Sequence, residues 1–163
     1  MDNIANQATL LYNNMTTNSN TVTTQILSLY DLTATKEALL DTYTPNQTIT
    51  YVTRVENTGS ASLYNLTIVD DLANGTLQYI DTSIEGYLNG SPIEIDVQKT
   101  ANTVTFKIDN VLNPNDNVLI IFETTTPTTN PEQITNTQTI TANGGSTTGP
   151  IVAVTPNPST SVK

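Results

Sequence analysis

Short segments in which polar and apolar residues alternate constrain the fold of this chain more than any other feature. Residues 48–55, for example, read Thr-Ile-Thr-Tyr-Val-Thr-Arg-Val. Successive side chains of a strand point to opposite faces of a sheet, so this alternation predicts strands with one buried face. The segments of this type, or with a continuous apolar run, are 48–55, 63–69, 103–108, 118–122, 134–141 and 151–155.

Asparagine, glycine and proline separate these segments. The turn candidates are Pro45-Asn46, Asn57-Thr58-Gly59, Asn74-Gly75, Asn89-Gly90, residues 113–116 and Asn143-Gly144-Gly145. Turn signals spaced by roughly 8–14 residues are typical of an antiparallel sandwich or barrel. One window, Thr33 to Asp41, also suits a helix, and we interpret it as a first strand followed by a loop.

The alternation also predicts which residues form the core. The run 118–122 is apolar throughout, so we expect it to be a central strand. The side chains expected in the core are Ile49, Tyr51, Val55, Leu66, Ile68, Phe106, Ile108, Leu119 and Ile121.

Composition excludes several classes of function. The chain has no cysteine, histidine or tryptophan, and its net charge is −10. It therefore lacks thiolate ligands, the commonest general base and the commonest zinc ligand. We expect no enzyme activity, no cofactor and no metal. The negative charge disfavours nucleic acid and anionic lipid surfaces, and no stretch approaches the roughly 20 apolar residues of a membrane-spanning helix.

The two ends of the sequence resemble each other. Residues 3–25 align without gaps with residues 133–155, at an offset of 130. The matched pairs include Ile4 with Ile134, Asn6 with Asn136, Leu10 with Ile140 and Val22 with Val152. Each segment reads as strand, asparagine-containing turn and strand, so the chain begins with a copy of its own closing hairpin. Convergence of threonine-rich strands is the alternative explanation.

These patterns divide the chain into three parts. Residues 1–29 form an N-terminal arm or hairpin, and residues 30–155 form an antiparallel β-sandwich. Residues 156–163 form a tail, because Pro156 cannot donate to a strand ladder. The start of the sequence shows no basic region followed by an apolar core, so no signal peptide is visible in it.

Several motifs, in order, resemble a family of surface repeats. They are Ala34-Thr35-Lys36, the series Tyr43 to Tyr51, Val55-Glu56-Asn57-Thr58-Gly59, residues 66–72 and Ile134-Thr135-Asn136-Thr137. This series resembles the domain known as domain of unknown function eleven, which occurs in tandem in bacterial and archaeal cell-surface proteins. The family often has proline after Asp-x-Leu, where this chain has Ala73. The resemblance implies an immunoglobulin-like sandwich, a spacer or assembly role and no catalytic activity.

The resemblance also implies a candidate covalent cross-link. Related surface sandwiches join a lysine of the first strand to an asparagine of a late strand beside a carboxyl group. Lys36 and Asn136 occupy these places in chain order, with Asp70, Asp71 or Glu56 as the assisting carboxyl group. The alternative is that Lys36 is a solvated lysine at a sheet edge and Asn136 an ordinary turn residue.

Acidic loops offer a second interpretation. Asp70 and Asp71 with Asn74, and residues 113–117 around Asp116, present the oxygen ligands that calcium prefers. Neither loop follows the twelve-residue calcium-binding pattern, so solvated loops are the simpler interpretation.

The sequence predicts a structural protein located at an extracellular surface. The surface could be a cell wall, a filament or a spore appendage. The arm has the sequence of a closing hairpin but no domain of its own to close, so it suits donation of strands to a neighbouring copy. The residues expected to contact that copy are Ile4, Leu10, Leu11, Val22 and Ile26. The partner is then the same chain, head to tail, and Asn6 is the candidate for an intermolecular link to Lys36. The alternative function is a passive stalk or spacer repeat of a larger surface protein or adhesin.

Overall fold

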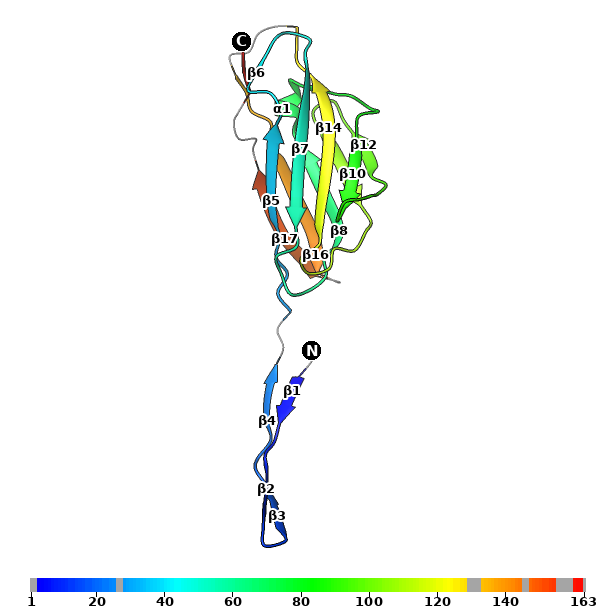
Figure 1. Cartoon of the computed structure of the whole chain (residues 1–163). Helices are drawn as coiled ribbons and strands as arrows, with labels where there is room; N and C mark the ends of the chain where they lie inside the picture. Colours follow the sequence, from blue (N-terminus) through cyan, green and yellow to red (C-terminus); the bar gives the residue numbers. More distant parts are fainter. Residues whose placement is uncertain (1–2, 26–27, 129–132, 145–146, 155–159, 163) are drawn as a thin grey trace.

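The computed structural model describes residues 3–25, 28–128, 133–144, 147–154 and 160–162 (Figure 1). The elements, in order, are β1 Asn3–Asn6, β2 Thr9–Tyr12, β3 Met15–Asn18, β4 Val22–Gln25, β5 Thr33–Ala38, β6 Thr42–Tyr43, β7 Thr48–Glu56, β8 Tyr64–Asp70, α1 Leu72–Gly75, β9 Gln78–Tyr79, β10 Glu85–Leu88, β11 Ser91–Pro92, β12 Asp96–Lys99, β13 Val104–Ile108, β14 Asn117–Thr125, β15 Gln133–Ile134, β16 Gln138–Gly144, β17 Thr147–Val154 and β18 Thr160–Val162.

Two antiparallel sheets pack face to face into a sandwich. The first sheet has the strand order β11-β10-β14-β7-β5, with β9 also paired to β14, and the second has the order β12-β13-β8-β16-β17. The first strand of the sandwich, β5, ends one sheet, and β17 ends the other. These two edge strands contact each other on the same side of the molecule (Figure 1). The predicted β-sandwich is confirmed.

The alternation in the sequence becomes alternation of burial. Every second residue of β7 from Ile49 to Val55 is buried, and β8 and β13 follow the same pattern. Aromatic rings fill the space between the sheets: the ring centroids of Tyr51 and Phe122 lie 5.4 Å apart and those of Phe106 and Phe122 lie 5.1 Å apart. Offset and tilted ring pairs at such distances add to the stabilisation from area burial alone.

The register expected for β14 is wrong by one residue. Val118, Ile120 and Phe122 are buried in the core, whereas Leu119 and Ile121 are only half-buried on the opposite face of the sheet. A continuous apolar run fits either register, so alternation alone does not orient this strand. The stacking of Phe122 on Tyr51 is possible only in the observed register. The remaining predicted core residues, from Ile49 to Ile108, are all buried.

Two other expectations differ from the structure. The segment 134–141 is not one strand, because β15 ends at Ile134 and β16 begins at Gln138. Within the predicted tail, Thr160–Val162 form β18, which pairs in parallel with β6 and antiparallel with β15. The window 33–41 is the strand β5 followed by a bend, as expected. No helix among the described residues is long and apolar enough to cross a membrane.

The N-terminal arm is a two-stranded hairpin drawn in blue in Figure 1. β1 pairs with β4 and β2 pairs with β3, around a turn at Asn13 and Asn14. The closing hairpin of the sandwich, β16–β17, has the same topology but another register. Leu10 faces Thr17, whereas its aligned residue Ile140 faces Val152. The two segments are alike in sequence and in hairpin topology, but their cross-strand partners differ.

The Asn-Thr-Gly motif, residues 57–59, holds the backbone in place at the start of the sandwich. Asn57 is fully buried, and its side-chain amide donates to the carbonyl oxygens of Ala61 and Leu112. Gly59 packs against the backbone of Leu29 so closely that a Cβ there would lie 2.2 Å from the Leu29 carbonyl oxygen. Ser60 and Ala61 both donate backbone N–H groups to that same oxygen. Only glycine permits this approach, which fixes the segment between the arm and β5.

Candidate functional site: a buried lysine, aspartate and asparagine

Lys36 points into the sandwich. It follows Thr35 and precedes Glu37 in β5, and the alternation of this strand turns Lys36 and Ala38 inward while their neighbours face out. The residue is only 2% exposed. A lysine in a protein interior is rare, because removing its charge from water costs several kcal/mol unless the amine is paired or neutral.

Asp70 lies in the opposite sheet and accepts a hydrogen bond from Lys36. It is the last residue of β8 and is fully buried. The Lys36 Nζ atom donates to Asp70 Oδ2 at 2.7 Å, and the backbone N–H of Leu72 donates to Asp70 Oδ1 at 2.8 Å. The pair therefore joins the edge strand of one sheet to the end of β8 in the other sheet.

Asn136 lies in the gap between β15 and β16 and is also fully buried. Its Nδ2 atom donates to Asp70 Oδ2 at 3.3 Å, and its backbone oxygen accepts from Lys36 Nζ at 3.0 Å. The Asn136 Oδ1 atom accepts from the backbone N–H of Ala73 at 3.3 Å, which fixes the orientation of the amide. The interruption of the predicted strand 134–141 thus places this side chain beside the Lys36 amine.

The surroundings of Lys36 favour the neutral amine. Burial lowers the pKa of Lys36 from its ordinary value, while the neighbouring Asp70 and Asp71 oppose this shift. The Lys36 Nζ atom also lies 4.6 Å from the centroid of the Tyr51 ring and 5.8 Å from that of Phe122. A neutral amine has a free electron pair and is a nucleophile, whereas an ammonium group is not. Removal of Lys36 from water therefore favours the form that can react.

The three side chains combine the parts of an acyl-transfer reaction. Lys36 provides an amine, the Asn136 side chain provides an acyl group, and the Asp70 carboxyl group contacts both nitrogen atoms. A carboxyl group in hydrogen-bonding reach of both the nucleophile and the leaving group can carry a proton from one to the other. The structure brings Lys36, Asp70 and Asn136 together as the sequence interpretation requires.

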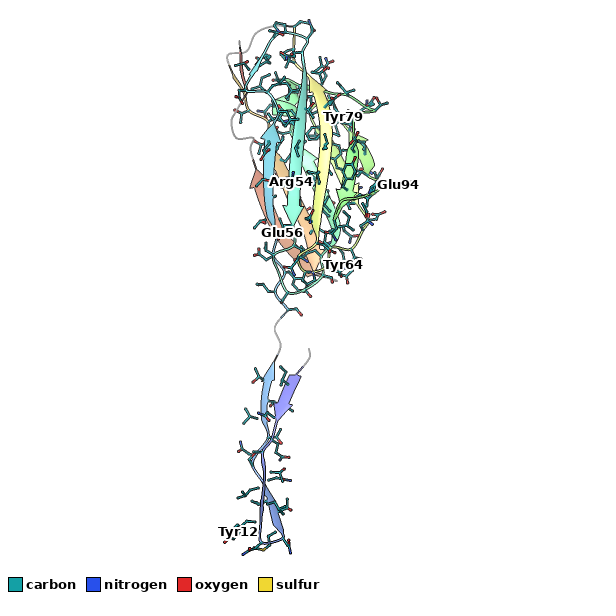
Figure 2. The ribbon with its side chains drawn as sticks, in the orientation of Figure 1. Tyr12, Arg54, Glu56, Tyr64, Tyr79 and Glu94 are labelled. Atoms are coloured by element: carbon teal, nitrogen blue, oxygen red, sulfur yellow. The ribbon has the colours of Figure 1, made fainter. Side chains whose placement is uncertain are left out.

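The other predicted site residues lie elsewhere. Asp71 is half-buried at the rim of the site, where its Oδ1 accepts from the backbone N–H groups of Ala73 and Thr137. Glu56 is exposed at the end of β7 and has no contact with the cluster (Figure 2). Asn6 is exposed in β1, opposite Val22 of β4.

Three further residues complete the cluster, and sequence reasoning missed their role. Gln138 is fully buried, its Nε2 donates to Asp70 Oδ2 at 2.9 Å, and its Oε1 accepts from Thr53 Oγ1 at 2.8 Å. Tyr51 was expected only as core, yet its side chain hydrogen-bonds Asn136, and burial raises its pKa far above the ordinary value. Polar residues at inward positions of strands, such as Thr53 in β7 and Gln138 in β16, are the signal that could have identified them.

The predicted assembly residues on the arm are exposed. Ile4 and Val22 are each 59% exposed, Leu10 is 63% exposed and Leu11 is 68% exposed. Tyr12 and Met15 extend the apolar surface toward the tip of the hairpin, where Figure 2 labels Tyr12. Ile26 lies outside the described residues.

The acidic loops show no metal cage. Within the described ranges, no group of three acidic, histidine or cysteine side chains converges on one point. The Asp116 carboxylate accepts from Asn89 Nδ2 at 2.7 Å and from the Asn113 backbone N–H at 2.7 Å, and these bonds lower its pKa. Each oxygen of the Asp116 carboxylate therefore accepts a hydrogen bond from a protein donor.

No family model and no curated protein sequence matches this chain. Its fold is similar to those of several solved surface proteins. The major pilin subunit BcpA of Bacillus cereus superposes with a TM-score of 0.58 at 13% identity, over 93% of this chain and 48% of that protein. The major pilin SpaD of Corynebacterium diphtheriae gives 0.63 at 14% identity, over 78% and 34%. The N-terminal domain of the Streptococcus gordonii adhesin Sgo0707 gives 0.58 at 17% identity, over 80% and 32%. This chain therefore spans about half or less of these structures, and the likeness establishes the immunoglobulin-like sandwich.

Proposed function

We propose that this chain is a structural subunit of an extracellular surface filament or appendage, and that an amide bond between Lys36 and Asn136 closes its sandwich. The observation that carries the proposal is the buried contact of Lys36 Nζ with Asp70 Oδ2 at 2.7 Å, beside the Asn136 amide. The likeness of the fold to pilin subunits and an adhesin domain supports the structural role. Lys36 is buried, so it is not accessible to a substrate from outside.

The reaction needs only groups already in the core. Burial favours the neutral Lys36 amine, which attacks Asn136 Cγ. The new C–N bond forms while negative charge develops on Oδ1. Asp70 then transfers a proton from the attacking nitrogen to Nδ2, and the carbonyl reforms as the Cγ–Nδ2 bond breaks. Ammonia leaves with the proton that Asp70 relayed from the amine, and Asp70 ends as it began, so no external reagent is required.

The bond would change how the protein resists unfolding. Lys36 and Asn136 are 100 residues apart in sequence. Closing a loop of that length in the unfolded chain stabilises the folded state by about 4–5 kcal/mol in the chain-entropy model of disulfides. A pulling force applied outside the loop could not extend the residues within it. A filament subunit would gain resistance to shear in this way.

Intact mass tests the bond. Bond formation releases one ammonia, so the purified protein should weigh about 17 Da less than its sequence mass. Lys36→Ala and Asn136→Ala should each restore the full mass expected for their sequences. Lys99→Ala is the matched control, because Lys99 is exposed and pairs with Asp81 at 2.5 Å. That variant should keep the deficit, and a wild-type protein of full mass would exclude the bond.

The arm supplies the second part of the proposal, which is assembly by donation of strands to a neighbouring copy. An isolated two-stranded hairpin is marginally stable in water, and this one exposes Leu10, Leu11 and Met15 by 63%, 68% and 72%. Burial against another surface would stabilise both the hairpin and the contact. Its sequence likeness to β16–β17 favours a second copy of this chain as the partner. Such a head-to-tail contact propagates into a fibre.

Electron microscopy and sedimentation test this assembly. Replacing Leu10 and Leu11 together by Asp should abolish fibres or oligomers and leave a folded monomer. Leu39→Asp is the matched control, since Leu39 is 60% exposed on the sandwich rather than on the arm. Polymers that persist in the arm variant would exclude the arm as the connector. A wild-type protein that stays monomeric at high concentration would favour the passive stalk repeat.

The same samples distinguish the proposed intermolecular link. A bond between Asn6 of one copy and Lys36 of another would give ladders that survive boiling in detergent. Asn6→Ala would remove them. The arrangement of Lys36 against Asn136 of its own chain favours the intramolecular bond. Membership of the tandem surface-repeat family stays a prediction.

A further inference from the structure

A left-handed turn stands directly beside the Asn136 amide. Leu72, Ala73 and Asn74 have φ angles of 48°, 51° and 55°, so the short element α1 is not a right-handed helix. Elsewhere in the described chain, the non-glycine residues with positive φ are all asparagines. Asparagine tolerates this conformation, whereas Leu and Ala are strained in it because their Cβ atoms approach the following carbonyl oxygen. Strain of this kind persists where the surrounding structure requires a particular backbone direction.

The turn directs one backbone N–H group at a reacting atom. The Ala73 N–H donates to Asn136 Oδ1 at 3.3 Å and also to Asp71 Oδ1 at 2.9 Å. Ala73 is buried, and Asn136 is fully buried. The Ala73 donor is therefore shared in the resting state, and the shorter of its two bonds goes to the carboxylate.

We propose that the Ala73 N–H is an oxyanion hole for the cross-linking of Lys36 to Asn136, and that Asp71 restrains the reaction by competing for this donor. The inference rests on the proposed bond and adds a catalytic group to it. As Lys36 attacks Cγ, Oδ1 gains a full negative charge, and its hydrogen bond from the Ala73 N–H strengthens. A fixed donor that binds the charged oxygen more strongly than the amide oxygen lowers the barrier, because it stabilises the transition state preferentially.

Asp71 has two effects on this step. Its Oδ1 holds the turn in place by accepting from Ala73 and Thr137, which are 2.9 Å away in both cases. The same carboxylate carries a negative charge next to the oxygen that becomes charged. Removing the charge while keeping the acceptor should therefore accelerate the reaction, whereas a merely structural Asp71 would give no acceleration.

The experiment starts from full-length chain made by cell-free translation and collected in urea, so that it has not folded. Dilution starts folding, and intact mass follows the loss of about 17 Da with time. Replacing Ala73 by lactic acid through a suppressor tRNA exchanges the N–H for an ester oxygen and keeps the side chain. The bond should form about 10²- to 10³-fold more slowly, as for loss of one oxyanion-hole donor. The matched control is the same exchange at Leu77, whose N–H donates to the Leu72 carbonyl oxygen at 3.0 Å in the same turn.

Asp71→Asn supplies the test of sign. Asp70 and Asp71 raise the pKa of Lys36 by their charge, and the titratable Tyr51 faces it with its ring centroid 4.6 Å from Nζ. Loss of the Asp71 charge also lowers the pKa of Lys36, which shifts the rate curve to lower pH but leaves its high-pH plateau unchanged. Weaker competition from the neutral Asn side chain instead raises the high-pH plateau of the rate. The increase should be about tenfold if the bond from the Ala73 N–H to Asn136 Oδ1 strengthens as bonds to charged groups do.

The outcomes separate the two proposals. A wild-type chain that never loses ammonia overturns the cross-link itself. A wild-type chain that reacts, with an Ala73 ester that reacts as fast as the Leu77 ester, overturns only the oxyanion hole. If the cross-linking rate at high pH is unchanged or lower in Asp71→Asn, the proposal that Asp71 competes for the Ala73 N–H is overturned. Slow reaction of the Ala73 ester together with a raised plateau in Asp71→Asn is the result that we expect.

Discussion

The arm and the closing hairpin of the sandwich have similar sequences and opposite environments. Ile140 of β16 is fully buried against the core, whereas its aligned residue Leu10 is 63% exposed. Asn136 is fully buried beside a lysine, whereas its aligned residue Asn6 is exposed. The difference comes from the partner surface. β16 lies between β8 and β17 and faces the first sheet across the core, while the arm consists of the pairs β1–β4 and β2–β3 alone.

This comparison shows what a hairpin sequence does and does not determine. Alternation and asparagine turns suffice to form both hairpins, because these features act over a few residues. Burial of the apolar side chains, and contact between Lys36 and Asn136, require a second sheet packed against the hairpin. For β16–β17 this sheet belongs to the same chain. We infer that the N-terminal arm packs against a sheet of a neighbouring copy. The most informative experiments therefore change aligned positions in the arm and in β16–β17.

The largest effect on stability is expected at the aligned asparagines. Asn136→Ala removes the cross-link and should lower the free energy of unfolding by about 4–5 kcal/mol or more. Asn6→Ala should change it by less than about 0.5 kcal/mol, as at ordinary surface sites. Denaturant unfolding of both variants measures the difference. Equal and small effects would show that Asn136 carries no covalent bond.

Within the sandwich, β14 offers the next comparison. Ile120→Ala empties a buried site in the core and should cost about 2–5 kcal/mol. Ile121→Ala, on the half-buried face, should cost clearly less. Both should be measured by denaturant unfolding in the Lys36→Ala background, so that the cross-link does not hold the chain together. A larger cost at Ile121 would restore the register expected from sequence.

Much of the fold follows from local patterns, and its exceptions have physical causes. β7, β8 and β13 were predictable because polar and apolar residues alternate strictly in them. The register of β14 was not, because both faces of that strand are apolar. The strands β10, β11 and β12 were missed, since they are short, edge-proximal and only partly buried.

The site was predictable in part. Lys36, Asp70 and Asn136 could be chosen through a family resemblance and their order in the chain. The break between β15 and β16, which places the Asn136 amide near Lys36, could not be predicted, because the alternation in the sequence continues through it. The left-handed turn at Leu72 and Ala73 was also hidden, since neither residue type favours that conformation and only tertiary contacts impose it.

The pH dependence of cross-linking sharpens the contrast between buried and exposed lysines. Only the neutral amine attacks, so the rate should rise with pH and level off above the pKa of Lys36. Burial lowers that pKa from 10.5, so the half-maximal rate should fall below pH 10.5. Uncross-linked chain, collected in urea from cell-free translation before it folds, is diluted into a pH series, and the loss of mass with time gives the curve. A midpoint at or above 10.5 would mean that the reacting lysine is solvated.

The smallest effect is expected on the arm. Leu11→Ala should leave the free energy of unfolding of the monomer unchanged within about 0.5 kcal/mol, because Leu11 is 68% exposed. It should nevertheless weaken assembly, measured as a higher concentration for fibre or oligomer formation. A clear loss of monomer stability would show that the arm packs on its own sandwich.

Single-molecule pulling tests the central claim, a covalently closed sandwich that resists extension, most directly. The protein is held by its two ends and unfolded, and the released length is compared with that of Asn136→Ala. Lys36 and Asn136 are 100 positions apart in the sequence, so the loop spans 100 steps from one Cα atom to the next. At about 3.3–3.6 Å for each residue, the wild type should release roughly 330–360 Å less than the variant. Equal extensions would contradict the cross-link and with it the proposed mechanical role.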